Sequence, residues 1–365
     1  MVDAAQSKIS GAARLERARE LVMRFGWNAT SYQIINPGIH HWFAKDGDAV
    51  VGFVNAQGVR VVAGAPVCSK ERLREVASEF ERDAELANQR VCYFCAEARL
   101  ESVYAASPGH TRVLLGAQPV WRPAGWAAMA AKNKSLRAQL NRARNKGVTI
   151  AEWTSEKAQN NSALIDCLHE WLASKPLPPL HFLVEPNTLA HLSDRRIFVA
   201  EREKEIVGFV LLSPVTNRRG WLFEQYPHRP KAAPNGTVEL MIDTAMRALA
   251  ETDYDYATLG LSPLSTRAEV APFNNPLWLR VMLAWMRKHG QRFYNFDGLD
   301  RFKSKLRPDR WEPVFAISNQ PRFSIGTLYA IAAAFSENAP FCLISVGLRR
   351  ALAAELKWLG RAISD

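Results

Sequence analysis

Short apolar segments and amphipathic helical segments alternate along most of this chain of 365 residues. The predicted helices lie at 11–25, 71–88, 160–173, 237–250 and 277–289, and the predicted strands at 50–55, 59–63, 91–96, 197–201, 206–213, 219–224, 256–260 and 312–318. This alternation is typical of α/β folds, and the same order occurs in both halves of the chain. We therefore predict an α/β (α+β) protein built from two similar units in tandem.

The length of the chain indicates how many domains it has, and its charge indicates what kind of partner it binds. A chain this long exceeds what one hydrophobic core serves, which favours two domains. Lysine and arginine outnumber the acidic residues by 47 to 36, giving a net charge of +11, and a basic protein favours an anionic partner such as nucleic acid or a phospholipid surface. An odd set of five cysteines and an N-terminus without an apolar segment predict a cytoplasmic protein, either free or peripheral on the inner face of the membrane.

One segment is strongly basic. From Ser102 to Ala151 the chain has no Asp or Glu, but it has eight lysines and arginines. If 133–146 is helical, one face carries Lys134, Arg137, Asn141 and Arg144, and the opposite stripe carries Leu136, Leu140 and Ala143. Such a polar face can bind the phosphates of nucleic acid or lipid. The alternative is a linker helix whose charges are solvated.

A turn at 234–237 precedes the predicted helix 237–250. Asn235, Gly236 and Thr237 form the turn, Thr237 can cap the helix, and the helix start offers free N–H groups to an anion. Glu239 follows in the first turn of the helix. Its carboxylate either binds a substrate or only interacts favourably with the positive end of the helix dipole. Upstream, Arg229 can clamp a phosphate or carboxylate, and Glu224 lies at the end of a predicted strand.

Two further polar segments follow predicted strand 256–260 and predicted helix 277–289. Ser262 and Ser265 come after the strand and are either turn residues or candidates for orienting a substrate. No G-x-S-x-G motif surrounds them, so the sequence does not support a serine hydrolase. Beyond 293, Tyr294 is one of several aromatic residues, and Lys303 and Lys305 alternate with Phe302 and Leu306, which predicts that at least one lysine points toward a site.

Taken together, these segments resemble the catalytic domain of the aminoacyl-phosphatidylglycerol synthases, which are also called phosphatidylglycerol lysyltransferases or multiple peptide resistance factors. The resemblance covers roughly 30–318 and is carried by 37–43, 64–67, 136–144, 234–239, 260–265, 293–299, Lys303, Lys305 and 311–313. It implies two tandem GNAT-like acyltransferase folds with a tunnel between them. It also implies an aminoacyl-tRNA donor, a lipid hydroxyl acceptor such as that of phosphatidylglycerol, and membrane-lipid modification linked to antimicrobial peptide resistance.

The domain boundaries follow from this resemblance and from the charge pattern. We expect a first GNAT-like domain at 1–130, a basic linker helix at 131–155 and a second GNAT-like domain with the catalytic site at 156–320. The remaining segment, 321–365, is expected to be an amphipathic helical extension, with a helix near 345–362 that either lies on a lipid surface or packs on its own domain.

The chain also departs from the family pattern. It lacks the polytopic flippase domain that commonly precedes this domain, so it looks like a stand-alone version. Tyr226 stands where the pattern has an Asp, and Asp300 stands where it usually has an Arg. These two positions put the carboxylate role and the identity of the substrate in question.

The resemblance implies a role for each candidate residue in acyl transfer from an aminoacyl-tRNA ester to a lipid hydroxyl. Arg229 and the backbone of 235–237 would bind the lipid phosphate, Glu239 or Glu224 would recognise an amine or act as base, and Lys303 with Ser262 or Ser265 would contact the donor ester. Tyr294 and Lys305 would contact substrate, and the helix bearing Lys134, Arg137, Asn141 and Arg144 would hold the tRNA acceptor stem. We expect no metal and no cofactor, because the eight histidines form no spaced ligand set.

Two other functions remain open at this point. One is a GNAT enzyme that uses acyl-CoA, although the chain lacks the R/Q-x-x-G-x-G/A loop of that class. The other is a non-enzymatic module that binds tRNA or an anionic membrane through the basic segment. The amino acid carried, the acceptor lipid and the oligomeric state do not follow from the sequence.

Overall fold

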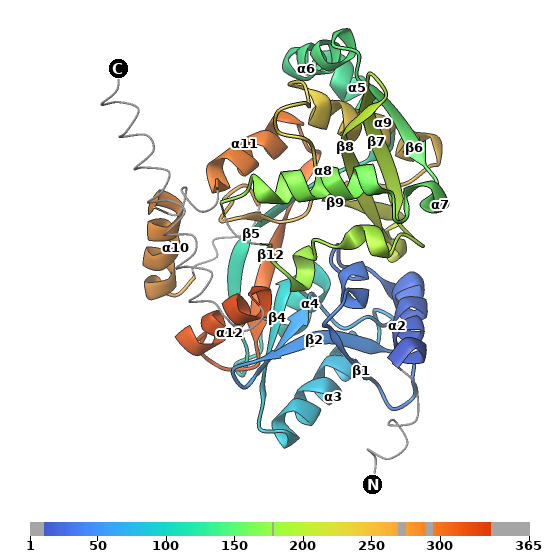
Figure 1. The fold of residues 1–365 in the computed structure, drawn as a ribbon. Coiled ribbons are helices and arrows are strands. Elements are labelled where there is room, and N and C mark those ends of the chain that lie inside the picture. Colours follow the sequence, from blue (N-terminus) through green and yellow to red (C-terminus); the bar gives the residue numbers. More distant parts are fainter. Residues whose placement is uncertain (1–10, 177–178, 269–274, 290–294, 337–365) are drawn as a thin grey trace, which may run out of the picture.

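The computed structural model of the chain describes residues 11–176, 179–268, 275–289 and 295–336 (Figure 1). The strands are β1 (His40–Phe43), β2 (Val50–Ala56), β3 (Val59–Ala63), β4 (Arg90–Ala96), β5 (Thr111–Trp121), β6 (Thr149–Trp153), β7 (Arg196–Arg202), β8 (Glu205–Val215), β9 (Gly220–Gln225), β10 (Tyr256–Thr258), β11 (Ser262–Pro263) and β12 (Arg310–Ser318). The α-helices are α2 (Gly11–Phe25), α3 (Leu73–Leu86), α4 (Ala98–Tyr104), α5 (Pro123–Lys132), α6 (Lys134–Asn145), α7 (Ser155–Ala158), α8 (Ser162–Ala173), α9 (Thr237–Glu251), α10 (Leu277–His289), α11 (Phe296–Lys305) and α12 (Ile325–Phe335), and the 3₁₀ helix η1 spans Tyr32–Ile35.

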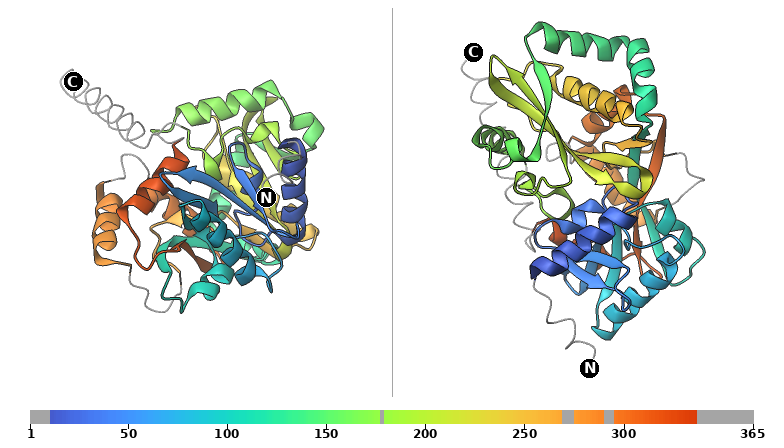
Figure 2. Two further views of the ribbon diagram at one scale, coloured as in Figure 1. Left: turned by 90° about the horizontal axis from the view of Figure 1, so that it is seen from below. Right: turned by 90° about the vertical axis from the view of Figure 1, so that its right-hand side faces the viewer.

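Within these residues, one sheet runs through the whole molecule. Its strand order is β1-β2-β3-β4-β12-β5-β10-β9-β8-β7-β6, with β11 paired to β5 outside this path. Figure 1 and the right-hand view of Figure 2 show α2, α3 and β1 to β4 at one end of the molecule and α5, α6 and α9 at the other. The mixed α/β fold predicted from the sequence is confirmed.

The two halves repeat the same order of elements. In the first half β1, β2 and β3 are antiparallel neighbours, α3 follows, and β4 returns parallel to β3. In the second half β7, β8 and β9 are antiparallel neighbours, α9 follows, and β10 returns parallel to β9. Each half therefore contains one parallel strand pair joined by a helical crossover, as the tandem arrangement implies.

The two halves exchange strands at the centre of the sheet. β12, which is late in the sequence, pairs with β4 of the first half, and β5, which is early, pairs with β10 of the second half. β5 and β12 also pair with each other, from Thr111 opposite Ser318 to Val120 opposite Arg310. Because the sheet is continuous from β4 to β10, the domain boundaries drawn at 130, 155 and 320 stay a prediction.

The sequence did not predict β5. Gly116 and Pro119 interrupt its apolar pattern, and both residue types weaken a strand signal. In the sheet Gly116 has a φ of +153° and lies where the register between β5 and β12 shifts, so it marks a bulge. A Cβ at this position would lie 2.3 Å from the Ser262 carbonyl oxygen of β11, which explains why glycine occurs there.

The predicted basic helix is α6, which begins at Lys134. The side chain of Asn133 caps it by accepting a hydrogen bond from the N–H of Leu136. The predicted apolar stripe of Leu136, Leu140 and Ala143 is buried in one hydrophobic core with residues of α5, α9 and β9. The helix therefore packs on the second half of the molecule, and its polar face is left outward.

A buried ion cluster ties the two halves together beside the exchanged strands. Arg218, which precedes β9, donates to Glu97 at 3.0 Å and to Glu312 of β12 at 2.6 and 2.9 Å. Its guanidinium also lies 3.7 Å from the ring centroid of Tyr256. Burial raises the pKa of Glu97 to about 7, although the charge of Arg218 opposes that shift. Arg218 thus bridges two acidic residues from different parts of the chain, and Arg310 adds a second cation on Glu312.

The C-terminal helix expected at 345–362 lies outside the described residues. Among the helices that the structure does describe, none combines the length and apolar character needed to cross a bilayer.

We expect Arg218→Met to destabilise the protein by about 3–5 kcal/mol, because it leaves the buried Glu97 without its cation and removes one of the two arginines that pair with Glu312. The neighbouring Arg219, whose side chain is 62% exposed and pairs with Asp253 and Asp255, provides the matched control. Arg219→Met is expected to cost no more than about 1 kcal/mol. Urea unfolding followed by circular dichroism measures both changes, and equal losses in the two variants would contradict the role given to Arg218.

Candidate functional site

The candidate site lies where the parallel strands β9 and β10 separate. The two strands pair only over 220–222 and 256–258. Beyond these residues the chain leads from β9 toward the turn at 234–237 and from β10 into the segment 260–265. All three polar segments singled out in the sequence therefore start from, or pack against, the carboxyl ends of one strand pair, which is a usual location for a binding site in α/β folds.

Lys303 of α11 is the central charged group of this site. Lys303 is only 2% exposed, and its Nζ donates to the carbonyl oxygens of Gly260 at 2.9 Å and Leu261 at 2.8 Å. Burial lowers the pKa of Lys303 to about 7, while the nearby charge of Asp300 acts in the opposite direction. Near neutral pH this amine can therefore both take up and release a proton.

Asp300 organises the segment around Lys303. Its carboxylate accepts hydrogen bonds from Ser265 Oγ at 2.6 Å, Ser262 Oγ at 3.4 Å and Arg267 Nε at 2.7 Å. Both serine hydroxyls, which the sequence suggested as substrate contacts, therefore point at Asp300 in this structure. They hold the 260–265 segment in the shape that presents two carbonyl oxygens to Lys303.

Glu224 belongs to a second buried cluster, at the end of β9. Its two carboxylate oxygens accept from Arg195 at 2.9 and 3.1 Å, and the two side chains are 4% and 1% exposed. Arg195 also donates to the carbonyl oxygen of His191 at 2.6 Å and to Asn36 Oδ1 at 3.3 Å. The charge of Glu224 is thus balanced by an arginine that also contacts the first half of the chain.

Arg229 already has protein partners. Its Nε donates to the Ile206 carbonyl oxygen of β8 at 2.8 Å, and its Nη1 pairs with Glu170 of α8. Its backbone N–H also donates to Val207 at 2.9 Å. The guanidinium that the sequence suggested for a lipid phosphate is therefore bound to β8 and α8.

The turn before α9 packs against α6. Gly236 has a φ of +95°, and a Cβ there would lie 2.1 Å from the carbonyl oxygen of Gln139. Gly236 takes the N-cap position, and the Thr237 hydroxyl donates to the Pro234 carbonyl oxygen at 2.7 Å, so the predicted N-cap role of Thr237 is wrong. Glycine at the cap lets the turn approach the helix, which explains the difference.

The outward face of α6 therefore adjoins the start of α9. Lys134, Arg137 and Asn141 are exposed, and Arg144 is half exposed and pairs with Asp243 of α9 at 3.3 Å. Asn235 is exposed in the turn, and Glu239 in the first turn of α9 is partly exposed.

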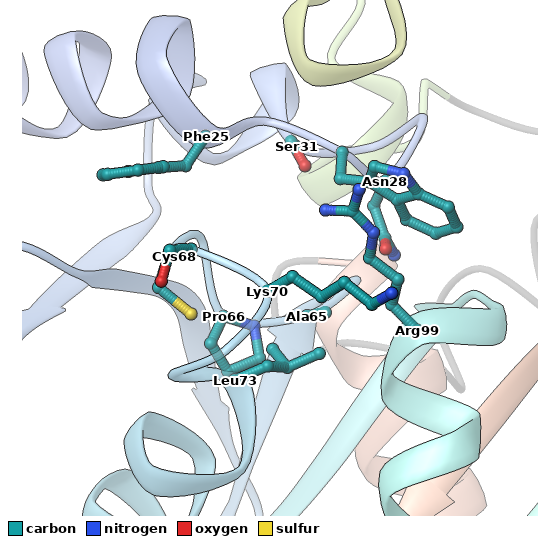
Figure 3. A pocket seen from close by; sticks show the side chains of 11 residues that line it. Phe25, Asn28, Ser31, Ala65, Pro66, Cys68, Lys70, Leu73 and Arg99 are labelled. Atoms are coloured by element: carbon teal, nitrogen blue, oxygen red, sulfur yellow. The ribbon is translucent and has the colours of Figure 1, made fainter.

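In the first half, the space beside the carboxyl ends of the parallel strands β3 and β4 is small. The cavity beside the ends of β3 and β4 has a volume of about 20 Å³, enough for roughly one water molecule. Lys70, Arg99 and Asn28 line it together with Pro66 and Cys68 (Figure 3). A space of this size does not hold a substrate.

Two other sequence candidates have different outcomes. Tyr294 lies outside the described residues. Lys305 is exposed, and its carbonyl oxygen accepts from Asn133 at 2.8 Å, which joins α11 to the start of α6. Arg195 and Arg267 were not predicted as members of the site, because in the sequence a single arginine near a strand or in a loop is indistinguishable from a surface cation.

We expect Gly236→Ala to destabilise the protein more than Gly58→Ala. Both glycines have a positive φ, but nothing lies within 4 Å of a Cβ at Gly58, whereas one at Gly236 would meet the Gln139 backbone. The control is expected to cost about 1 kcal/mol from backbone strain alone. Thermal unfolding of the two variants tests this, and an equal shift would show that α6 moves aside at no cost.

Comparison with known proteins gives a consistent result. A family model described as the C-terminal domain of phosphatidylglycerol lysyltransferase matches residues 19–318. Phosphatidylglycerol lysyltransferase of Staphylococcus xylosus is 21% identical over 303 residues, which cover 81% of this chain and 35% of that protein. The protein of the same name from Staphylococcus aureus strain MRSA252 is 23% identical over 319 residues, which cover 85% of this chain and 36% of that protein. The chain thus spans about a third of the length of these relatives.

Solved structures show the same fold. The structure of L-PGS from Bacillus licheniformis superposes with a TM-score of 0.72 at 21% identity, covering 87% of this chain and 95% of that one. The C-terminal domain of an Agrobacterium fabrum protein described as a lysylphosphatidylglycerol synthetase superposes with a TM-score of 0.77 at 22% identity, covering 90% and 98%.

Proposed function

This chain belongs to the family of the phosphatidylglycerol lysyltransferase C-terminal domain, and we propose that it transfers an amino acid from an aminoacyl-tRNA to a hydroxyl group of a phospholipid such as phosphatidylglycerol. The observation that carries this proposal is Lys303, a buried amine with a pKa near 7 at the carboxyl ends of two separating strands. Such a group is suited to proton transfer at neutral pH.

The reaction moves one proton from the acceptor hydroxyl to the ribose oxygen of the donor. The acceptor hydroxyl oxygen attacks the carbonyl carbon of the donor ester and forms a new C–O bond, and the bond from that carbon to the ribose oxygen breaks. In the neutral amine of Lys303 both N–H groups can serve the carbonyls of Gly260 and Leu261, which leaves the lone pair to take the hydroxyl proton. The resulting ammonium can return this proton to the ribose oxygen, so the same residue serves as base and then as acid.

Glu239 supports recognition of the donor amino acid. Its carboxylate lies in the first turn of α9, is partly exposed and comes directly after the turn at 234–237. Glu224, in contrast, has both oxygens engaged by Arg195. We therefore assign binding of the donor's ammonium group to Glu239 and a positioning role to Glu224.

The basic face of α6 supports a tRNA donor. Lys134, Arg137 and Asn141 are exposed on it, and the helix touches the turn that precedes Glu239. Phosphates of an acceptor stem bound along this face would bring the stem's 3′ end toward the start of α9. Because an ester donor is already activated, the transfer proposed here requires no cofactor.

We expect Lys303→Arg to lower the rate of transfer by about a hundredfold or more, because arginine keeps the positive charge but has no lone pair at neutral pH. For the unmodified protein the rate should rise with pH through about 7 and then level off, since the neutral amine is the base. The assay mixes charged tRNA with phosphatidylglycerol vesicles and detects the aminoacylated lipid by mass spectrometry.

Lys204→Arg serves as the control, because this lysine is exposed in the turn between β7 and β8, has no role in the proposed site and should leave the rate unchanged. Full activity of Lys303→Arg would exclude a base role for Lys303. A parallel reaction with acetyl-CoA, followed by thiol release, tests the acyl-CoA alternative. Release of thiol there without transfer from tRNA would contradict the proposed donor.

We expect Arg137→Glu to weaken tRNA binding and to reduce its salt dependence by about one phosphate contact. Arg82→Glu, an exposed charge reversal on α3 at the other end of the molecule, changes the net charge equally and is the control. Filter binding at several salt concentrations measures both slopes. A similar loss in the two variants would indicate only a general effect of net charge.

A further inference from the structure

A larger cavity lies on another side of the molecule, between α2, the segment from η1 to β1, and His191. Its volume is about 470 Å³, which is within the range of small-molecule sites. Pro37 and Gly38, which the sequence analysis singled out but the proposed function does not use, form part of its wall. Gly38 has a φ of +80°, so the loop takes a conformation that favours glycine.

The lining of this cavity combines cationic or titratable groups with apolar ones. Arg14, His40, His41 and His191 line it, and none of the described lining residues is acidic. Leu15, Ile35, Pro37 and Ile39 supply the apolar part. Such a lining matches an anion that carries an apolar group.

Arg14 is held in place with donors to spare. Its Nη2 donates to the His41 carbonyl oxygen at 2.7 Å, and its guanidinium lies 5.2 Å from the ring centroid of Phe43. An arginine has five N–H groups in a planar fork, so several remain for a phosphate. The three histidines are not a metal site, since none of the described residues form a group that could hold a metal ion.

The cavity is linked to the candidate site by one buried arginine. Two of its lining residues, Asn36 and His191, accept hydrogen bonds from Arg195 at 3.3 and 2.6 Å, and Arg195 also holds both oxygens of Glu224. A ligand in the cavity would thus lie one side chain away from Glu224.

We propose that this cavity binds the phosphodiester headgroup of a phospholipid, with Arg14 and His191 at the phosphate and Leu15 and Ile39 beside the lipid's apolar part. The proposal rests on the proposed function and names a site on this chain that holds the phosphate of the lipid. It replaces Arg229, whose guanidinium is already paired with Glu170.

Binding is tested in the absence of any tRNA. We expect dihexanoyl phosphatidylglycerol, below its micellar concentration, to bind the full chain in isothermal titration calorimetry. Dihexanoyl phosphatidylcholine has a compensating cation and is expected to bind more weakly. Arg14→Gln and His191→Gln should each weaken binding of phosphatidylglycerol by about tenfold. Arg24→Gln, on the same helix but outside the cavity, should leave it unchanged.

Further titrations distinguish a lipid from a soluble phosphate as the ligand. Inorganic phosphate and glycerophosphoglycerol, the soluble headgroup, should bind more weakly than the short-chain lipid, because they lack the apolar part. Equal binding of inorganic phosphate would overturn the assignment to a lipid, and an unchanged affinity in Arg14→Gln and His191→Gln would overturn the site. Circular dichroism checks folding, and exposed His191 gives a second variant if Arg14→Gln does not fold.

The transfer assay then distinguishes this proposal from the proposed function. If both are right, His191→Gln raises the KM for lipid without changing the KM for charged tRNA. Lipid binding that depends on Arg14, in a protein that transfers nothing, would contradict the proposed function and leave this site standing. Transfer with an unchanged KM for lipid in both variants would contradict the site alone.

Discussion

The pairing of β5 with β12 is the interaction on which the rest of the structure depends. The two strands lie at the centre of the sheet, and each also pairs with a strand of the half from which it is remote in sequence. Arg218 strengthens the same junction, because it binds Glu312 of β12 and Glu97, which follows β4. The two halves consequently share one hydrogen-bonded sheet, and the relative orientation of the elements around the candidate site is fixed by that sheet.

This arrangement explains how Lys303 comes to be buried although no carboxylate of the described residues forms an ion pair with it. β11 pairs with β5 and holds the segment 260–265, and Asp300 fixes the same segment through two serine hydroxyls. The carbonyls of Gly260 and Leu261 are then available to Lys303 from a rigid support. Burial in this setting depresses the pKa of the lysine, so the shift results from packing more than from charge pairing.

Much of the fold could be predicted from the sequence, because period-two and helical patterns directly reflect burial on one face. The buried stripe of α6 is an example, since Leu136, Leu140 and Ala143 occur at helical spacing. β5 could not be predicted, because Gly116 and Pro119 serve a bulge and a central pairing that only the assembled sheet requires. In the candidate site, too, only the features that depend on local sequence could be predicted. Local spacing indicated Lys303 and the turn at Gly236, but the partners of Glu224 and Arg229 come from remote segments, and sequence carries no signal for such pairs.

The exchanged strands also constrain the order in which the molecule can be made. Thr111 of β5 pairs with Ser318 of β12, about two hundred residues later in the chain. During synthesis on the ribosome the first half is therefore complete in sequence long before β12 emerges, and until then an edge of β4 and an edge of β5 have no strand to pair with. Closing the sheet is therefore a late, long-range event, and the edges of β4 and β5 stay open to pairing with other chains until it occurs.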